Sequence, residues 1–196
     1  PGGRTQLTIH NGRVVSGAPA ILRPTVLATI GEWEGRRSDV DLATVSPHLE
    51  PALLSMEDQR FREHSGVDPL GIARAVLMHA TGSGGQGGST ITQQLAKNLF
   101  LSSERTMRRK VREVFFAAAL ESELTKDELL ELYLREVYLG QMGGIPLYGV
   151  DAASQAWFGK SAARLELHEA ATIIGVIPAP NRFNPRRHPE TAEERR

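Results

Sequence analysis

The pattern of apolar and polar positions predicts a chain that is mostly helical after a short β-rich beginning. On both sides of Asn11-Gly12, the segment TQLTIHNGRVVSG carries β-forming residues around a two-residue turn signal, which predicts a hairpin. From residue 46 onward, apolar residues recur at helical spacing between capping residues, glycines and prolines. The sequence therefore predicts a β-rich appendage or linker over residues 1–45, followed by a compact helical domain.

Helix-start signals divide this domain into segments. Ser46 and Pro47 are typical of an N-cap and a first helical position, and open a helix that we expect to end near Gly66. Further helices are expected over residues 69–79, 90–100, 104–124, 125–140 and 165–176. The pairs with capping-box spacing are Thr90 with Gln93 and Thr125 with Glu128. The apolar run over residues 170–177 is too short to span a bilayer and fits a buried helix.

Composition narrows the possible chemistry. Lys plus Arg and Asp plus Glu number 23 each among the 196 residues, so no overall field favours nucleic acid. The absence of cysteine excludes disulfides, thiol nucleophiles and cysteine zinc sites. The tail RRHPETAEERR mixes charges as a solvated linker does. Because the chain starts at Pro1 and carries no signal peptide, we interpret it as a piece of a longer protein.

The first helix carries a carboxylate on the side that it should bury. Its apolar face contains Leu49, Leu53, Met56 and Phe61. Glu57 falls within this face, whereas Asp58 points further round, where Arg62 can pair with it. Desolvation raises the pKa of a carboxyl group, so Glu57 is a candidate for proton exchange, although it could equally pair with a buried arginine or cap a helix. His64, on the same side, is interpreted as a core hydrogen-bonding residue.

A glycine-rich loop and a basic cluster follow. The loop GSGGQGGST has the glycine spacing of a phosphate loop, but Gly88 stands where the lysine belongs and no strand precedes it. It opens onto a helix N-terminus, which suits an anion, and the polar side of that helix carries Thr90, Gln93, Gln94 and Lys97. On the next helix, Arg109 and Glu113 face the same way, with Lys110 beside them. An ordinary surface ion pair would produce the same pattern. Together with Glu57, this set suits sugar chemistry at a diphosphate-linked carbon.

Five segments extend this interpretation to a family. They are, in order, EDQRFREHSGVD, GGSTITQQLAKNLFL, RKVRE, KDELLELYLREVYLG and AASQAWFGKSAARLELHEAA. They resemble the motifs of the peptidoglycan glycosyltransferases (glycosyltransferase family 51), the lysozyme-like transglycosylase domains of class A penicillin-binding proteins and of monofunctional enzymes. The resemblance covers residues 46–196. LFLSSER and NPRRHPETAEERR are most similar to the bifunctional class A proteins, in which a penicillin-sensitive transpeptidase would follow.

The resemblance implies a reaction in which lipid II and the growing glycan are joined by β-1,4 bonds and undecaprenyl diphosphate leaves. By position, Glu57 matches the general base for the acceptor hydroxyl, and Glu113 matches the second catalytic carboxylate, near the donor diphosphate. The residues implied to bind substrate or the inhibitor moenomycin are Asp58, Phe61, His64, Ser89, Thr90, Gln94, Lys97, Asn98, Arg109 and Lys110. A Mg²⁺ or Mn²⁺ ion on the diphosphate is compatible with the resemblance, although the sequence contains no dedicated ligand cage for it.

The family also implies an architecture and a location. The glycosyltransferase domain would occupy residues 46–185, as a lysozyme-like large lobe and a small jaw lobe near 69–105 that dips into the membrane, and residues 186–196 would begin the linker to the transpeptidase. The protein would act on the extracytoplasmic (periplasmic) face of the bacterial cytoplasmic membrane, with cell-wall synthesis proteins as partners. One departure is Arg135, which follows Tyr133-Leu134 where the family has asparagine.

Two alternatives remain open from the residues alone. A helical cleft with two carboxylates could belong to a glycan hydrolase or lytic transglycosylase, with Glu57 as general acid. The cations Lys97, Arg109 and Lys110 favour a diphosphate leaving group instead. A non-catalytic domain that binds lipid II is the other alternative; the two intact carboxylates argue against it, and Arg135 is the one feature in its favour.

Overall fold

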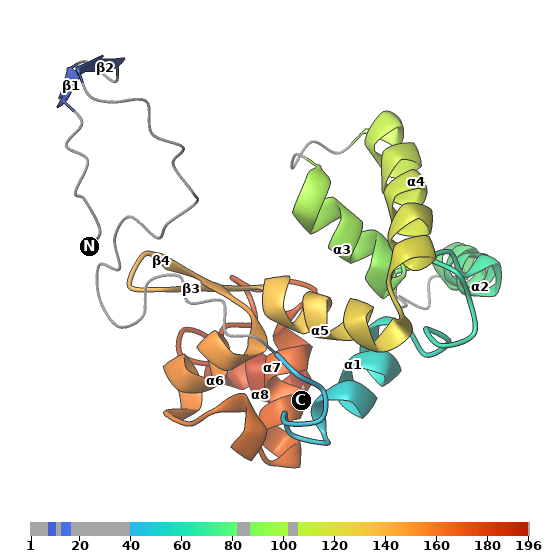
Figure 1. Ribbon diagram of the computed structural model, residues 1–196. Coiled ribbons are helices and arrows are strands. Elements are labelled where there is room, and N and C mark those ends of the chain that lie inside the picture. The colour runs from blue at the N-terminus through green and yellow to red at the C-terminus, as the bar shows by residue number, and fades with distance from the viewer. Residues whose placement is uncertain (1–7, 11–12, 17–39, 82–86, 102–105, 196) are drawn as a thin grey trace. The chain divides into compact units, whose positions relative to one another are not determined.

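The computed structural model describes residues 8–10, 13–16, 40–81, 87–101 and 106–195 (Figure 1). The chain divides into two compact units, Pro1–Glu34 and Gly35–Arg196. In the first unit, β1 (Thr8–His10) pairs antiparallel with β2 (Arg13–Ser16), as the β-forming residues on either side of the turn signal predict. The turn residues Asn11-Gly12 lie outside the described part of the chain.

The second unit is mainly α-helical, which confirms that part of the predicted fold class. Its helices are α1 (Leu49–Glu57), α2 (Pro69–Ala80), α3 (Ile91–Phe100), α4 (Met107–Glu123), α5 (Lys126–Glu136), α6 (Val150–Phe158), α7 (Leu167–Val176) and α8 (Pro189–Arg195), with a 3₁₀ turn η1 (Ala162–Arg164). Within the described ranges, none of these helices combines the length and the apolar composition needed to cross a membrane.

Side-chain caps fix several helix starts where the sequence predicts them. At α5, the Thr125 hydroxyl accepts from the backbone N–H of Glu128, and the Glu128 carboxylate accepts from the backbone N–H of Thr125, so the predicted capping box is complete. At α3, the Thr90 hydroxyl accepts from the backbone N–H of Gln93 at 3.2 Å. The Gln93 side chain does not complete that box, because its Oε1 accepts from Lys110 Nζ instead.

Helix α1 is shorter than predicted. It ends at Glu57 instead of near Gly66, because Asp58 leaves the helical conformation (φ −161°, ψ 78°) and turns its buried carboxylate inward. The prediction that Ser46 caps the helix is wrong: His48 holds the N-cap position, and the Ser46 hydroxyl donates to the carbonyl of Leu165.

The predicted pairing of Arg62 with Asp58 is also wrong. Arg62 forms ion pairs with Glu50 and Asp127 at 2.6 and 2.8 Å, on the exposed surface. The shorter helix explains the difference, because residues beyond Glu57 no longer follow helical spacing.

A β-hairpin replaces the expected end of α5. The helix stops at Glu136, and β3 (Tyr138–Met142) pairs antiparallel with β4 (Ile145–Tyr148). The two turn residues Gly143 and Gly144 both have positive φ, 59° and 88°, as a tight hairpin turn requires. Position 140 also requires glycine, because a Cβ there would lie 2.9 Å from the carbonyl oxygen of Pro180.

Two helices and part of the core were not predicted. Helix α6 was missed, and α8 forms in the tail that was interpreted as a solvated linker. Helix α8 packs against α7 and buries Ala192, so this tail belongs to the helical unit. Residues 40–45, assigned to the appendage from sequence, also contribute to that unit, because Val40 is buried in its core.

The helices pack around a buried centre formed largely by α5 and α7. Helix α1 packs on α7, α3 packs on α4 and α5, and α7 also contacts α6 and α8. Figure 1 shows α2, α3 and α4 to one side of α5, and α6, α7 and α8 to the other. The largest fully buried side chains include Leu49, Leu53, Phe61, Ile91, Leu95, Leu129, Leu130, Tyr133, Leu134, Leu139, Ile173 and Ile174. The apolar run over 170–177 is buried, as predicted.

Candidate active site

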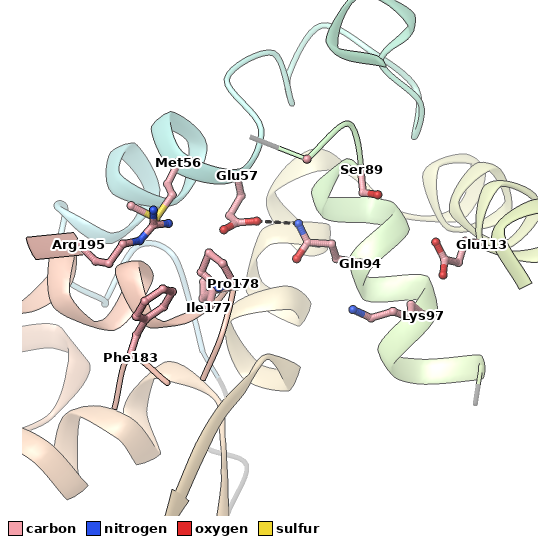
Figure 2. A pocket seen from close by; sticks show the side chains of 11 residues that line it. Met56, Glu57, Ser89, Gln94, Lys97, Glu113, Ile177, Pro178, Phe183 and Arg195 are labelled. Carbon is pink, nitrogen blue, oxygen red and sulfur yellow. Dashed lines mark hydrogen bonds between the residues drawn. The ribbon is translucent and has the colours of Figure 1, made fainter. Parts of the chain in front are cut away.

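A cavity of about 600 Å³ lies where α1, α3, α4 and the C-terminal helices meet (Figure 2). Its walls are formed by Met56, Glu57, Gly87, Ser89, Gln94, Lys97, Glu113, Ile177, Pro178, Phe183 and Arg195. Five of these residues belong to the predicted site, although they come from segments up to 56 positions apart in the sequence. The fold therefore brings together Glu57, Ser89, Gln94, Lys97 and Glu113.

Glu57 stands at the C-terminal end of α1, half-buried in the cavity wall. Its Oε2 accepts a hydrogen bond of 2.8 Å from Gln94 Nε2, drawn in Figure 2. Desolvation raises the pKa of Glu57 above its ordinary value, while the Gln94 hydrogen bond and the charges of Arg195 and Lys97 oppose that rise. A carboxyl group in this setting is suited to exchanging a proton with a ligand in the cavity.

Glu113 lines the far wall of the cavity, is 4% exposed, and is surrounded by cations that lie outside the cavity lining. Arg109 donates to its Oε1 and Lys110 to its Oε2, so both carboxylate oxygens are held by cations. Lys110 Nζ also donates to the Ser89 hydroxyl at 2.7 Å and to Gln93 at 3.0 Å. Lys110 thereby ties α4 to the loop before α3 and fixes the position of Ser89 in the cavity wall.

Lys97 differs from these two cations. Among the residues that the structure describes, none forms a hydrogen bond or ion pair with its ammonium group, although the group lies on the cavity wall. Desolvation lowers the pKa of Lys97, and the nearby Glu113 carboxylate acts against that change. An ammonium with no protein partner in a cavity is available to an anionic ligand.

The other predicted site residues lie outside the cavity lining. Asp58, Phe61 and His64 are buried in the interior, where His64 Nε2 lies 3.0 Å from Asp58 Oδ1 and the His64 ring packs edge-on against Phe61. Thr90 is the buried cap of α3, and its hydroxyl donates to the carbonyl of Gly66. Asn98 is exposed on α3 and does not line the cavity. The roles of these residues in substrate binding stay predictions.

A comparison with protein families identifies the chain. The family model for transglycosylases matches residues 23–196. The chain belongs to the transglycosylase family. The predicted membership of a transglycosylase family is thus confirmed.

Curated relatives of this transglycosylase domain are penicillin-binding proteins. It is 52% identical over 153 residues to penicillin-binding protein 1A of Escherichia coli K12, covering 78% of this chain and 18% of the relative. It is 49% identical over 169 residues to penicillin-binding protein 1A of Haemophilus influenzae, covering 85% and 19%. With penicillin-binding protein 1B of Vibrio cholerae it shares 46% identity over 149 residues, covering 76% and 19%. The chain spans about one-fifth of the length of these relatives.

Sequence reasoning missed one side of the transglycosylase cavity. Ile177, Pro178 and Phe183 follow α7, and Arg195 comes from α8. The Arg195 guanidinium lies 5.2 Å from the centre of the Phe183 ring, which supports its position beside Glu57. The charge pattern of the tail gave no sign of this role, because only the packing of α8 on α7 brings Arg195 to the cavity.

Arg135, the departure from the family motif, does not line the cavity. Its Nε lies 3.3 Å from the Glu136 carboxylate, and its side chain is about one-third exposed. The substituted position therefore contributes no side chain to the cavity wall of the transglycosylase domain.

Proposed function

We propose that this domain is a peptidoglycan glycosyltransferase that polymerises lipid II into β-1,4-linked glycan strands and releases undecaprenyl diphosphate. One observation carries the proposal: a half-buried carboxylate, Glu57, shares a cavity with Lys97, whose ammonium has no partner among the described residues, and with Glu113 and the cations around it (Figure 2). A proton acceptor and an anion site in the same cavity suit a sugar transfer in which the leaving group is a diphosphate.

In the proposed step, Glu57 takes the proton of the acceptor sugar's 4-hydroxyl. The hydroxyl oxygen forms a bond to the anomeric carbon of the donor, and the bond from that carbon to the diphosphate breaks. The diphosphate leaves with the electron pair, and Lys97 meets the charge that develops on it, supported by Arg109 and Lys110 around Glu113. Gln94 holds the Glu57 carboxylate through the hydrogen bond at 2.8 Å.

A Mg²⁺ or Mn²⁺ ion belongs to this proposal as a companion of the substrate. Among the described residues, no three histidine or carboxylate side chains are grouped to hold an ion, and both Glu113 oxygens are engaged by cations. The ion would therefore enter bound to the diphosphate, where it would neutralise negative charge.

The proposal extends to architecture and location. The helical unit, with α8 included, would form the lysozyme-like domain, with residues 69–105 as a jaw at the membrane. Exposed apolar side chains in the jaw range support contact with lipid, and they include Leu70, Leu77 and Phe100. The domain would act at the extracytoplasmic face of the cytoplasmic membrane, beside other cell-wall synthesis proteins and the growing glycan chain.

Supplying lipid II and finished glycan strands in parallel tests the proposed function. A transferase consumes lipid II, releases undecaprenyl diphosphate and leaves the strands intact. A hydrolase or lytic transglycosylase shortens the strands, and a binding-only domain retains lipid II without converting it. Either of the last two results overturns the proposal.

The rate of polymerisation is expected to fall on the acidic side because Glu57 must be ionised to accept a proton. Burial raises the pKa of Glu57, so the rate should rise with pH through that raised value and level off above it. The charged neighbours that also act on the pKa of Glu57, and so on the midpoint of this rise in rate, are Arg195, Lys97 and Asp58. The measurement is the initial rate across the acidic range, with circular dichroism at each pH as the control for folding. A flat profile in a folded domain contradicts the assignment of Glu57.

Replacing Lys97 with alanine is expected to weaken moenomycin binding by about tenfold to a hundredfold, the range for a lost charge-assisted hydrogen bond. The melting temperature should not fall, because the ammonium has no partner among the described residues. Arg164→Ala removes the same charge from an exposed position outside the cavity and should leave the affinity unchanged. Equal affinities for Lys97→Ala and the unsubstituted protein would remove Lys97 from the anion site.

A further inference from the structure

Glu57 is the first member of a chain of hydrogen bonds that runs through three helices. Gln94 Nε2, on α3, donates to Glu57 Oε2 at 2.8 Å, and the Tyr133 hydroxyl, on α5, donates to Gln94 Oε1 at 3.0 Å. Tyr133 is fully buried, whereas Gln94 lies on the cavity wall. The single amide of Gln94 therefore links the candidate base to a phenol in the core.

We propose that Tyr133 is a positioning residue for Glu57, which acts by holding the Gln94 amide with its N–H groups directed at the carboxylate. The inference rests on the proposed function of Glu57 as the general base. Tyr133 does not line the cavity. Its hydroxyl determines which way the Gln94 amide, which lies between Tyr133 and Glu57, faces.

The direction follows from counting donors and acceptors. An ionised carboxylate only accepts, so the amide must present its N–H side to Glu57 and its oxygen to Tyr133. If the amide turned by half a rotation, its oxygen would face the Glu57 carboxylate. The Tyr133 hydroxyl proton would then lose Gln94 Oε1, the acceptor it has within the described part of the chain, at the cost of a buried unpaired donor. The hydroxyl thus favours the orientation that stabilises an ionised base.

The surroundings of Tyr133 and Glu57, the two ends of this chain of hydrogen bonds, affect whether each group carries its proton. Complete burial holds the pKa of Tyr133 well above its usual range, so the phenol stays protonated and remains a donor. Burial raises the pKa of Glu57, and the Gln94 hydrogen bond is the largest influence against that rise. The other charged groups that act on Glu57 are Arg195 from α8, Lys97 from α3 and the adjacent Asp58, and none of them depends on Tyr133 for a hydrogen bond.

Tyr133→Phe removes the hydroxyl and keeps the ring that fills the core. Without its anchor, the Gln94 amide is held only from the Glu57 side, and its hydrogen bond to the carboxylate weakens. The midpoint of the acidic limb of the rate profile should therefore rise by about one pH unit, the change expected for a hydrogen bond to a charged group. The rate well above that midpoint should stay close to that of the unsubstituted protein.

The experiment follows the Glu57 carboxyl directly, by an NMR pH titration of the chain with isotope-labelled glutamate and no substrate. The signal is assigned from its loss in Glu57→Gln. The variants are Tyr133→Phe, Gln94→Met, which has no donor, and the two combined. Tyr148→Phe, on the half-exposed β4 hairpin strand, is the matched control for loss of a tyrosine hydroxyl.

We expect Tyr133→Phe to raise the titration midpoint of Glu57, Tyr148→Phe to leave it unchanged, and the double variant to match Gln94→Met, because Tyr133 acts through Gln94. An unchanged midpoint in folded Tyr133→Phe overturns the inference. Fully additive shifts in the double variant also overturn it, since they separate Tyr133 from the amide. If the titrations behave as expected but the unsubstituted protein makes no polymer, the proposed function fails and the positioning of Glu57 stands.

Discussion

Replacing Glu57 with glutamine is expected to reduce the polymerisation of lipid II by about a hundredfold to ten-thousandfold, the range that general base catalysis supplies. The amide has nearly the size of the carboxyl group, and its oxygen can still accept the hydrogen bond from Gln94. It cannot take up the proton of the acceptor hydroxyl. The initial rate with labelled lipid II at the pH optimum measures this loss.

The same substitution should not unfold the domain. Because desolvation raises the pKa of Glu57, the ionised carboxylate is less favourable in the folded than in the unfolded chain at pH values above that raised pKa. A neutral amide removes this cost, so Glu57→Gln should melt no lower than the unsubstituted protein at neutral pH. Glu123→Gln makes the same chemical change at the exposed end of α4 and should keep full activity. Activity of Glu57→Gln within a few-fold of that control would place the base elsewhere.

Replacing Asp58 with alanine is expected to produce the largest loss of stability, about 2–5 kcal/mol. The Asp58 carboxylate is buried, with 7% exposure, and its Oδ2 accepts from the backbone N–H of Ile91 at 3.0 Å. His64 Nε2 lies 3.0 and 3.1 Å from its two oxygens. Alanine would leave two buried donors without an acceptor, at the point where the end of α1 meets the start of α3. Urea unfolding followed by circular dichroism measures the change.

An exposed aspartate supplies the comparison for Asp58. Asp127→Ala removes a carboxylate whose side chain is 64% exposed and paired with Arg62, and should cost less than about 1 kcal/mol. Asp58→Asn keeps one acceptor and should fall between the two alanine variants. If Asp58→Ala unfolds at the same urea concentration as Asp127→Ala but loses substrate affinity, Asp58 contacts substrate and is not the internal support that its contacts indicate.

Local chemistry explains which elements the sequence predicted. The capping box of Thr125 and Glu128 joins residues three positions apart, so it is visible in the sequence and is present in the structure. The early end of α1 depends on Asp58, whose partner Ile91 lies 33 positions further on. The apolar spacing continues past Glu57, and nothing local indicates that Asp58 will turn inward.

The site was predictable to the extent that its residues occur in family motifs. Glu57, Gln94 and Glu113 lie in segments that resemble the family motifs, and the fold places all three in the wall of one cavity. Arg195 and Phe183 were missed because they reach Glu57 only when α8 packs against α7. The connection from Tyr133 to Glu57 was equally invisible, since it joins α1, α3 and α5 through a single amide.

Gel-resolved polymerisation of labelled lipid II by this chain, with and without moenomycin, is the decisive experiment for the proposed transferase. We expect a ladder of glycan strands that lengthens with time and disappears when moenomycin is added. Lipid II that remains intact in the presence of the folded chain would contradict the proposal.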